Sequence, residues 1–403
     1  MRAYERLLKY ARINTQSCEA NYMNTPSSDL EFDLARVLEA EMKEMGFSDV
    51  YMDEHAYVYG FIPATAGHEN DDAIGFIAHL DIVGDFGSGD PKPQVVENYD
   101  GSVITLGTSG LTLDPCKARK REDILGKTLI HTDGTTVLGA DDKAGVAEIM
   151  TMCERLLAGE REHGKICVCF TPDEEIGHGA ELLDLDRFGA KYAYTVDGEK
   201  PCEVEYETFN AAKADWTITG YSVHPGSAKD TMINAITVAM DVNGMLPEME
   251  VPEHTEGREG FYHLHTMSGD VAHAKMEYIL RDHDKSLLEV KKQKMLEVEK
   301  AINAKYGEGV AKVAIADQYQ NMAEILKDYP HVVKRAEDAI KKVGLTPVSN
   351  PVRGGTDGAQ LSFRGLPCPN LGTGGANYHG PFEFAVVEEM DTMVEILLAV
   401  AEA

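Results

Sequence analysis

The sequence predicts an α/β fold with a mostly parallel sheet, helices on both faces of that sheet, and a smaller inserted α+β domain. Two observations predict it. Short apolar runs alternate with helical patterns in the first half of the 403 residues, and this rhythm changes in the middle of the chain. Strands that alternate with helices are joined by right-handed crossovers, which make neighbouring strands parallel.

The first half contains three apolar runs of strand length. They are residues 73–78 (AIGFIA), 166–170 (ICVCF) and 192–196 (YAYTV). The segment between the first two carries apolar residues at helical spacing. One face of that predicted helix holds Val146, Ile149, Met150, Cys153, Leu156 and Leu157.

The middle of the chain has longer strand and helix patterns. Strands are expected at 214–220, from 278 onward and at 310–316, and helices at 232–245 and 287–306. Such units suit a small α+β domain with an open sheet. A helix at 332–343 then returns to the α/β body, so we expect a catalytic domain at 1–207 and 321–403 and an inserted domain at 208–320.

Composition excludes some partners and compartments. The formal net charge is −30, which argues against nucleic acid, because its binders carry basic surfaces. No apolar run is long enough for a membrane span or a signal peptide, so we expect neither. The seven cysteines, an odd number without a C-x-x-C pair, indicate free thiols in the cytoplasm.

Five segments deliver side chains that can bind metal. IAHLD, FTPDEE and YTVDG end apolar runs, NLGTGGANYHG is a glycine-rich loop, and LGADDKAG precedes a helix. In an open α/β sheet, ligands bind at the carboxyl ends of the strands. The candidates are His79, Asp81, Asp141, Asp142, Glu174, Glu175, Asp197 and His379.

Each segment alone has an ordinary explanation. Asp141 and Asp142 could cap the helix that follows, Asp197 could form a turn, and a histidine after a strand is usually hydrogen-bonded. Together they place many carboxylates at one sheet edge, where concentrated negative charge needs a cation. Mixed histidine and carboxylate ligands suit zinc, with manganese or cobalt as alternatives.

The adjacent carboxylates Glu174 and Glu175 can have different tasks. If one binds a metal ion, the other is free to take a proton from a water molecule that the metal activates. In the same way His79 can be a ligand while Asp81 orients its imidazole.

Taken together, the segments HLD, TDGTTVLGADDKAGVAEIM, FTPDEEIGHGA, AYTVDG, EGFYHL, RGGTDGAQLSFRGLPCPN and NYHG resemble the zinc-dependent M20 peptidase family. They occur in order over nearly the whole chain. The resemblance implies an aminopeptidase that removes the N-terminal residue from tripeptides, and a middle domain that acts as a lid and in homodimer formation.

The resemblance also implies a site with two Zn²⁺ ions per subunit, for which Co²⁺ or Mn²⁺ could substitute. Asp141 would bridge the ions, about 3.5–4 Å apart. His79 and Asp197 would complete one metal site, Glu175 and His379 the other. Glu174 would be the general base, Asp81 would support His79, and the Asp141–Asp142 peptide would be cis. His178 is expected outside the metal shell, because five ligands are already assigned.

Four residues are implied as substrate contacts. His224 matches a lid histidine that stabilises the oxyanion, in many relatives from a partner subunit. Arg281 and Arg353 would hold the carboxylate of the peptide, since guanidinium pairs with it through two hydrogen bonds. Asn234 is a weaker candidate. For each arginine, a structural ion pair is the more common role.

Two other functions stay open at this point. One is a dipeptidase or N-acyl amino acid deacylase with the same metal chemistry, and the other is a metal-binding scaffold without catalysis. Retention of Glu174 argues against the scaffold. The sequence departs from the family pattern at Ile82, Val83 and Ala376, which bears on side-chain preference and not on the ligands.

Overall fold

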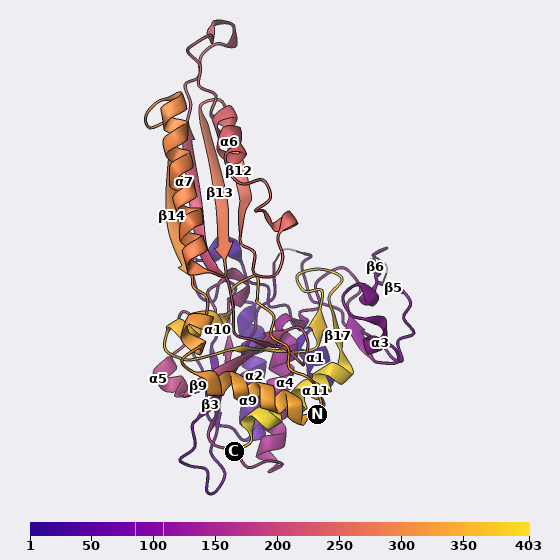
Figure 1. Cartoon of the computed structure of the whole chain (residues 1–403). Helices are drawn as coiled ribbons and strands as arrows, with labels where there is room; N and C mark the ends of the chain where they lie inside the picture. Colours follow the sequence, from indigo (N-terminus) through magenta and orange to yellow (C-terminus); the bar gives the residue numbers. More distant parts are fainter. Residues whose placement is uncertain (85, 108) are drawn as a thin grey trace. The chain divides into compact units, whose positions relative to one another are not determined.

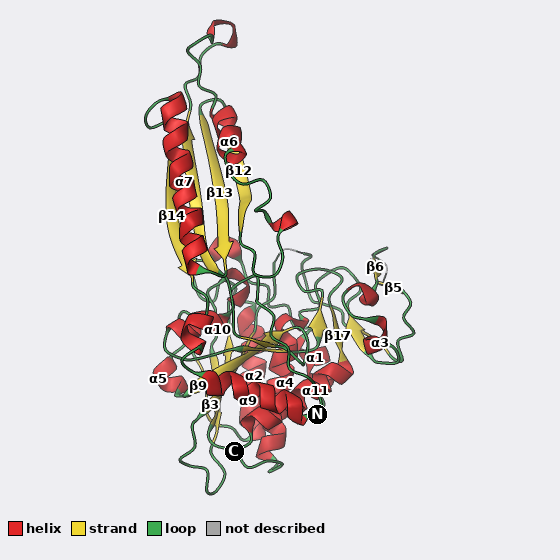
Figure 2. Ribbon diagram, in the orientation of Figure 1, coloured by secondary structure: helices red, strands yellow, loops and turns green. Residues whose placement is uncertain are grey.

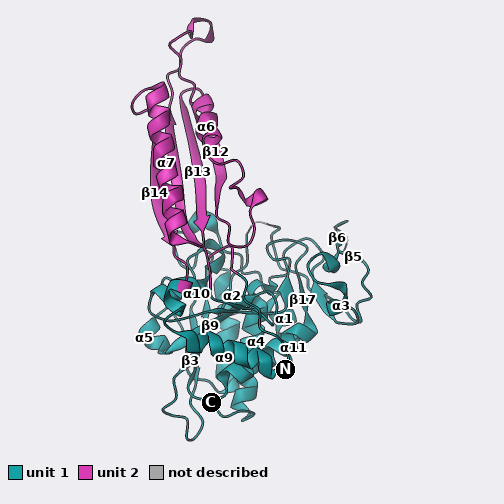
Figure 3. Cartoon of the chain, in the orientation of Figure 1, with its two compact units in different colours: residues 1–206, 324–350, 356–403 teal, residues 207–323, 351–355 magenta. Residues whose placement is uncertain are grey.

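The chain folds into two compact units (Figure 3). The structure is a computed structural model that describes residues 1–84, 86–107 and 109–403. The first unit consists of Met1–Tyr206, Glu324–Asn350 and Thr356–Ala403, and the second of Glu207–Ala323 and Pro351–Gly355. The division into catalytic and lid domains at 207 and 320 stays a prediction.

A seven-stranded sheet forms the centre of the first unit (Figure 1). Its order is β1-β2-β8-β3-β9-β15-β10, and the four strands β8, β3, β9 and β15 are parallel. This confirms the predicted mostly parallel sheet. The strands are β1 Ser48–Met52, β2 Val58–Ile62, β3 Ile74–His79, β8 Ile166–Thr171, β9 Tyr192–Gly198, β10 Val204–Glu205 and β15 Asn370–Gly372.

Helices cover both faces of this sheet, as predicted. Phe76 and Val168 face a core with α1, α2, α4, α9 and α11, whereas Ile77 and Cys167 face the side of α5 and α10. This alternation reflects the period of two in a β-strand. The helices are α1 Ala3–Tyr10, α2 Glu31–Met45, α4 Ala140–Leu157, α5 Leu185–Phe188, α9 Pro330–Lys342, α10 Asp357–Phe363 and α11 Val387–Ala401.

A second, antiparallel sheet of short strands belongs to the same unit, in the order β16-β17-β7-β4. The sequence patterns described above did not predict these strands. They are β4 Gln94–Val96, β7 Leu129–His131, β16 Gly375–Ala376 and β17 Phe384–Val386, with a separate hairpin of β5 Ile104–Thr105 and β6 Thr112–Leu113. The turns η1 Glu19–Asn21, η2 Pro115–Lys117 and η3 Glu174–Ile176 and the helices α3 Arg121–Ile124 and α8 Ala323–Leu326 complete the connections.

The second unit is a four-stranded antiparallel sheet with two helices (Figure 2). Its order is β12-β13-β11-β14, and Trp216 on β11 packs with Val238 of α6 and Met295 of α7. This is the predicted open α+β arrangement, although β12 was not identified from the sequence. The elements are β11 Asn210–Thr219, η4 Pro225–Ser227, α6 Ala235–Gly244, η5 Pro252–His254, β12 Phe261–Gly269, β13 His273–Asp282, α7 Lys285–Tyr306 and β14 Ala311–Tyr319.

Candidate metal centre

Three neighbouring parallel strands end at the candidate centre. His79 is the last residue of β3 and pairs in register with Thr171, the last residue of β8. Asp197 lies near the end of β9, on the other side of β3. Since parallel strands present their carboxyl ends at one edge, the fold itself brings these segments together.

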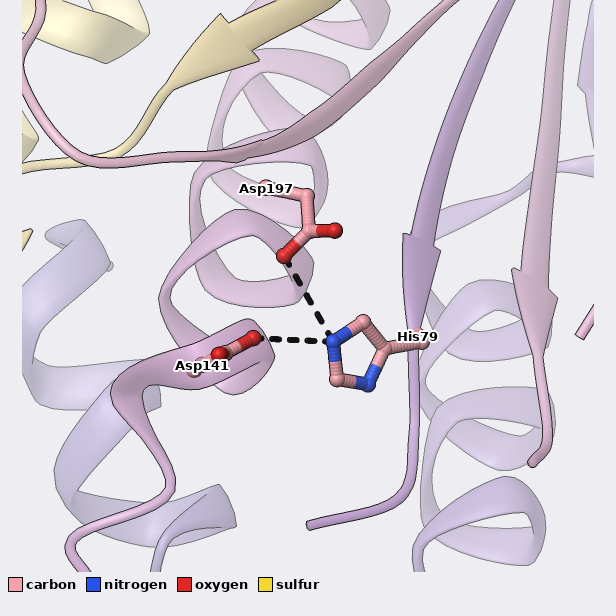
Figure 4. A group of neighbouring side chains, drawn as sticks. All are labelled: His79, Asp141 and Asp197. Carbon is pink, nitrogen blue, oxygen red and sulfur yellow. Dashed lines mark hydrogen bonds and ion pairs between the residues drawn. The ribbon is translucent and has the colours of Figure 1, made fainter. Parts of the chain in front are cut away.

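One group of side chains contains His79, Asp141 and Asp197 (Figure 4). The Nε2 atom of His79 lies 2.9 Å from a carboxylate oxygen of Asp141 and 3.5 Å from one of Asp197. The ligand atoms of the three residues all lie within 4.8 Å of one another. The His79 side chain is only 2% exposed, so this group is enclosed by protein.

A second group contains Asp141, Glu175 and His379. The Nε2 atom of His379 lies 3.1 Å from the other carboxylate oxygen of Asp141 and 3.1 Å from Glu175. Asp141 thus offers one oxygen to each histidine. The two groups share this aspartate, which is the geometry that a bridging ligand requires.

Asp81 connects His79 with the pair of glutamates. One of its carboxylate oxygens lies 3.3 Å from Nδ1 of His79 and accepts a hydrogen bond of 3.0 Å from the Glu174 N–H. The other oxygen accepts a hydrogen bond of 3.2 Å from the Glu175 N–H. Asp81 is fully buried and therefore fixes the turn that follows β8 relative to the end of β3.

Asp141 and Asp142 have different surroundings, and the peptide bond between them is cis, as predicted. Asp142 is fully buried; its side chain accepts hydrogen bonds from the backbone N–H groups of His79, at 3.1 Å, and Gly145, at 3.2 Å. It therefore satisfies a donor in the first turn of α4, which was the ordinary explanation considered for both aspartates. Asp141 instead faces the two histidines.

The charges of the centre depend on one another. Hydrogen bonds that the Asp141 and Glu175 carboxylates accept from His379 raise the pKa of this histidine to about 11. Burial works to lower the pKa of His79, but the charge of Asp197 and the hydrogen bonds with the surrounding carboxylates raise it well above its usual value. The carboxylates thus favour positive charge at both histidines, which is the electrostatic demand that a metal ion would meet.

The pKa values of the carboxyl groups differ because their contacts differ. Burial raises the pKa of Asp141, but its hydrogen bonds with His379 and His79 outweigh this and hold the pKa below its usual range. Burial raises the pKa of Glu174 well above its usual value, and raises that of Glu175 to about 8. Glu174 belongs to neither group; it is a partly buried residue whose carboxyl lies beside them.

Two buried acids near the centre were not identified from the sequence. Glu383 accepts backbone hydrogen bonds from Leu138, Gly139 and Asp141, at 2.7, 2.8 and 3.0 Å, and so holds the loop that presents Asp141. Asp357 accepts a hydrogen bond of 2.9 Å from the Thr171 hydroxyl. Asp357 lies in the RGGTDG segment that was singled out, whereas Glu383 follows no pattern that could have revealed it.

The predicted substrate contacts all lie in the second unit. Asn234 caps α6 by accepting from the N–H groups of Ile236 and Thr237, and His224 accepts from the N–H of Gly226. Arg281 donates to Gln318 and lies over the Tyr319 ring. The two hydrogen bonds that cap α6 give Asn234 a structural task that is independent of substrate.

Arg353 is engaged by the loop before β12. Its guanidinium donates to the carbonyl groups of Gly257 and Glu259 and to the Thr255 hydroxyl, and it lies over the rings of Phe209 and Phe261. These are neutral partners, so the positive charge of Arg353 is not paired with a carboxylate in these contacts.

His178 belongs to neither metal group among the described residues and lies 2.9 Å from Glu181. The two groups suit a pair of divalent ions, because each offers one imidazole nitrogen with carboxylate oxygens from two residues. Among the described residues, none of the helices combines the length and the apolar composition that a membrane span requires.

The α/β body with its inserted unit and the two groups around a shared aspartate have the features of a metal-dependent hydrolase. Residues 133–403, more than half of the chain, match the model of Peptidase family M20/M25/M40, and the chain belongs to this family.

Within the family, the chain is similar to peptidase T. Peptidase T from Clostridium novyi (strain NT) is 50% identical over 400 residues, which cover 98% of each sequence. The crystal structure of aminopeptidase PepT from Bacillus cereus ATCC 10987 matches with a TM-score of 0.77 and 25% identity, over 99% of this chain and 97% of that one. A tripeptidase from Staphylococcus aureus has the same fold, with a TM-score of 0.79 at 21% identity over 100% of this chain and 97% of that one.

Proposed function

We propose that the chain is an aminopeptidase that removes the N-terminal residue from tripeptides at a dinuclear zinc site. The observation that carries this proposal is the position of Asp141, whose two oxygens face His79 and His379 separately. Similarity to peptidase T along nearly the whole sequence supports the choice of substrate.

In this proposal, Asp141, His79 and Asp197 would hold one zinc ion, and Asp141, Glu175 and His379 would hold the other. Cobalt or manganese could substitute, since the ligand atoms suit all three metals. Zinc in such a site would supply Lewis acidity and lower the pKa of a bound water molecule to about 7.

Glu174 is proposed as the general base and then the general acid. Its backbone is fixed through Asp81, and its burial raises the pKa of the carboxyl group. A carboxylate with a raised pKa holds a proton more readily, so Glu174 can take one from water and deliver it to the leaving amine. Asp81 is proposed to orient His79 through Nδ1.

The inserted unit is proposed as the lid, with His224 stabilising the oxyanion and Asn234 as a weaker contact. Arg281 and Arg353 are proposed to bind the C-terminal carboxylate. The neutral partners of Arg353 support this role, because its charge is available to an anion. An enzyme that binds both ends of a peptide measures its length.

We further propose that the chain forms a homodimer through the inserted unit and works in the cytoplasm. The compartment is supported by the cysteines, all seven of which are free. Free thiols persist in reducing compartments.

The test is hydrolysis of alanine dipeptide, tripeptide and tetrapeptide, with N-acetylalanine as the acylated substrate, with and without a chelator. We expect chelator-sensitive release of alanine from the tripeptide and little from the others. Chelator-sensitive cleavage of the dipeptide or of N-acetylalanine instead would move the chain to the alternative dipeptidase or deacylase function. Arg353→Ala should raise KM for the tripeptide and weaken discrimination against its C-terminal amide; unchanged discrimination would contradict the role of Arg353.

A further inference from the structure

The two histidines of the centre are supported in different ways. His79 belongs to β3, which is hydrogen-bonded to strands on both sides. His379 follows β16 in a loop, and both His379 and Asn377 have left-handed backbone conformations, with φ of 63° and 58°. Non-glycine residues hold this conformation only where their surroundings support it, and loops position side chains less accurately than strands.

Some of this support comes from the end of β9. The Tyr378 and Thr373 hydroxyls both donate to the Gly198 carbonyl, each at 2.9 Å. The Gly374 N–H donates to the Glu199 carbonyl at 2.7 Å. The loop that carries His379 is therefore attached to the residues that directly follow Asp197.

Further support comes from a buried arginine in a distant part of the sequence. Arg119 lies between η2 and α3 and is only 4% exposed. Its guanidinium donates to the Gly375 carbonyl and, at 3.0 Å, to the Glu199 carboxylate; the carboxylate of Glu389 lies 3.6 Å from its Nε. One rigid guanidinium thus joins the His379 loop, the end of β9 and the start of α11.

We propose that Arg119 is a positioning residue for the second metal group. By fixing Gly375, four residues before His379, Arg119 sets the position of that imidazole and with it the metal affinity of the Asp141–Glu175–His379 group. This inference rests on the proposed dinuclear function and adds to it a residue outside every segment that carries ligands.

A guanidinium suits this task better than an ammonium. Its planar fork donates to a carbonyl and a carboxylate at once, in fixed directions, whereas lysine presents a single point charge. Arg121, two residues on, is the matched control, because it donates to the carbonyl groups of Asp100 and Gly101 at an exposed position in the same segment.

The experiment is Zn²⁺ binding to the metal-free full-length chain, measured by competition with a chromophoric chelator. We expect two ions per chain in the wild type and in Arg121→Ala. Arg119→Ala should bind the first ion as the wild type does and the second about 10- to 100-fold more weakly, which is the usual effect of removing a residue that supports a ligand. Tripeptide hydrolysis by Arg119→Ala should recover when excess Zn²⁺ is added.

Two further variants separate positioning from folding. Arg119→Lys keeps a cation in the buried position but loses the fork, and Glu199→Gln removes the charged partner, whose side chain is 50% exposed. Both variants should weaken the binding of the second zinc ion only, and the unfolding temperature of the metal-free protein should stay unchanged. If Arg119→Ala does not fold, these two variants test on their own whether Arg119 positions the second metal group.

The results distinguish three cases. Wild-type affinity for both ions in Arg119→Lys and Glu199→Gln would overturn the inference, as would a loss of both ions together with a lower unfolding temperature. A wild-type chain that binds fewer than two ions would overturn the dinuclear function itself, and the inference with it.

Discussion

The two halves of the metal centre share Asp141 but are built differently. The side chain of His79 is 2% exposed, is part of a strand and has Asp81 at its Nδ1 atom, whereas that of His379 is 54% exposed and lies on a loop. Similar ligand atoms therefore do not make equivalent sites. We expect the half with His79 to hold its metal ion more tightly, because its ligands need less ordering when the ion binds.

The largest effect is expected for a residue that belongs to neither half. Glu174→Gln should reduce kcat for tripeptide hydrolysis by about 10²- to 10⁴-fold, because the amide cannot accept the proton from water. Metal content, measured by atomic emission, should stay at the wild-type value. Glu175→Gln is the matched control and should lose metal. If Glu174→Gln loses metal instead, the two glutamates have the opposite roles.

Replacing each histidine tests the comparison directly. We expect His379→Ala to keep one tightly bound zinc ion per chain, because the His79 half remains complete. His79→Ala should retain zinc less well in the same chelator competition, because the enclosed half then lacks one of its three residues. Equal zinc retention by the two variants would show that the halves are equivalent, contrary to the structure.

Asp81 gives the enclosed half its support, and removing that support should have a smaller effect. Asp81→Asn keeps one hydrogen-bond acceptor but loses the second, which holds the Glu175 N–H. We expect a fall of about 10- to 100-fold in zinc affinity or in kcat/KM. Asp100→Asn, at an exposed turn, should change neither. Wild-type zinc affinity and kcat/KM in Asp81→Asn would mean that Asp81 is not needed to position His79.

Glu148 on α4 has a buried carboxyl group that lies outside both halves of the centre, and it can be compared with the carboxyl groups inside them. It is fully buried, and within the described residues neither of its oxygens has a hydrogen-bond partner. Burial raises its pKa well above the usual value of 4.5. The folded chain therefore holds a proton that the unfolded chain releases above about pH 4.5, so this residue destabilises the fold increasingly as pH rises.

Substitution of Glu148 should give the smallest effects, and effects on stability alone. Glu148→Gln should flatten the fall in unfolding free energy above pH 5, by at most about 1.4 kcal/mol per pH unit for one proton. Glu148→Met should also remove the cost of an unpartnered polar group, about 1–3 kcal/mol. Chemical denaturation from pH 5 to 9, with zinc content and kcat as controls, would measure this; parallel curves for wild type and Glu148→Gln would contradict it.

The sequence revealed what depends on regular patterns. Apolar runs predicted β3, β8 and β9, and the polar residues at their ends predicted which segments meet at the centre. It did not reveal β12, because only Tyr262 of that edge strand is buried and no alternation stands out. The strands β16 and β17 are too short, at two and three residues, to show a period.

Arg119 and Glu383 were missed for a different reason. Both are charged residues in loops, where a sequence pattern is typical of solvent exposure, yet both are buried and bind backbone groups far away in the chain. The Gly375 carbonyl that binds Arg119 and the N–H groups that bind Glu383 belong to the backbone, so no residue type marks these interactions. The carboxylate that Arg119 also binds, that of Glu199, is far away in the sequence. Only the folded chain shows that these residues support the loops of Asp141 and His379.

Stepwise return of zinc to the metal-free chain tests the two-metal centre most directly. Bound zinc would be counted after gel filtration, and hydrolysis of the alanine tripeptide would be measured on the same samples. We predict no hydrolysis without zinc, a plateau at two ions per chain, and full activity only when the second ion is bound. A plateau at one ion, or hydrolysis by the zinc-free chain, would contradict a dinuclear centre built on Asp141.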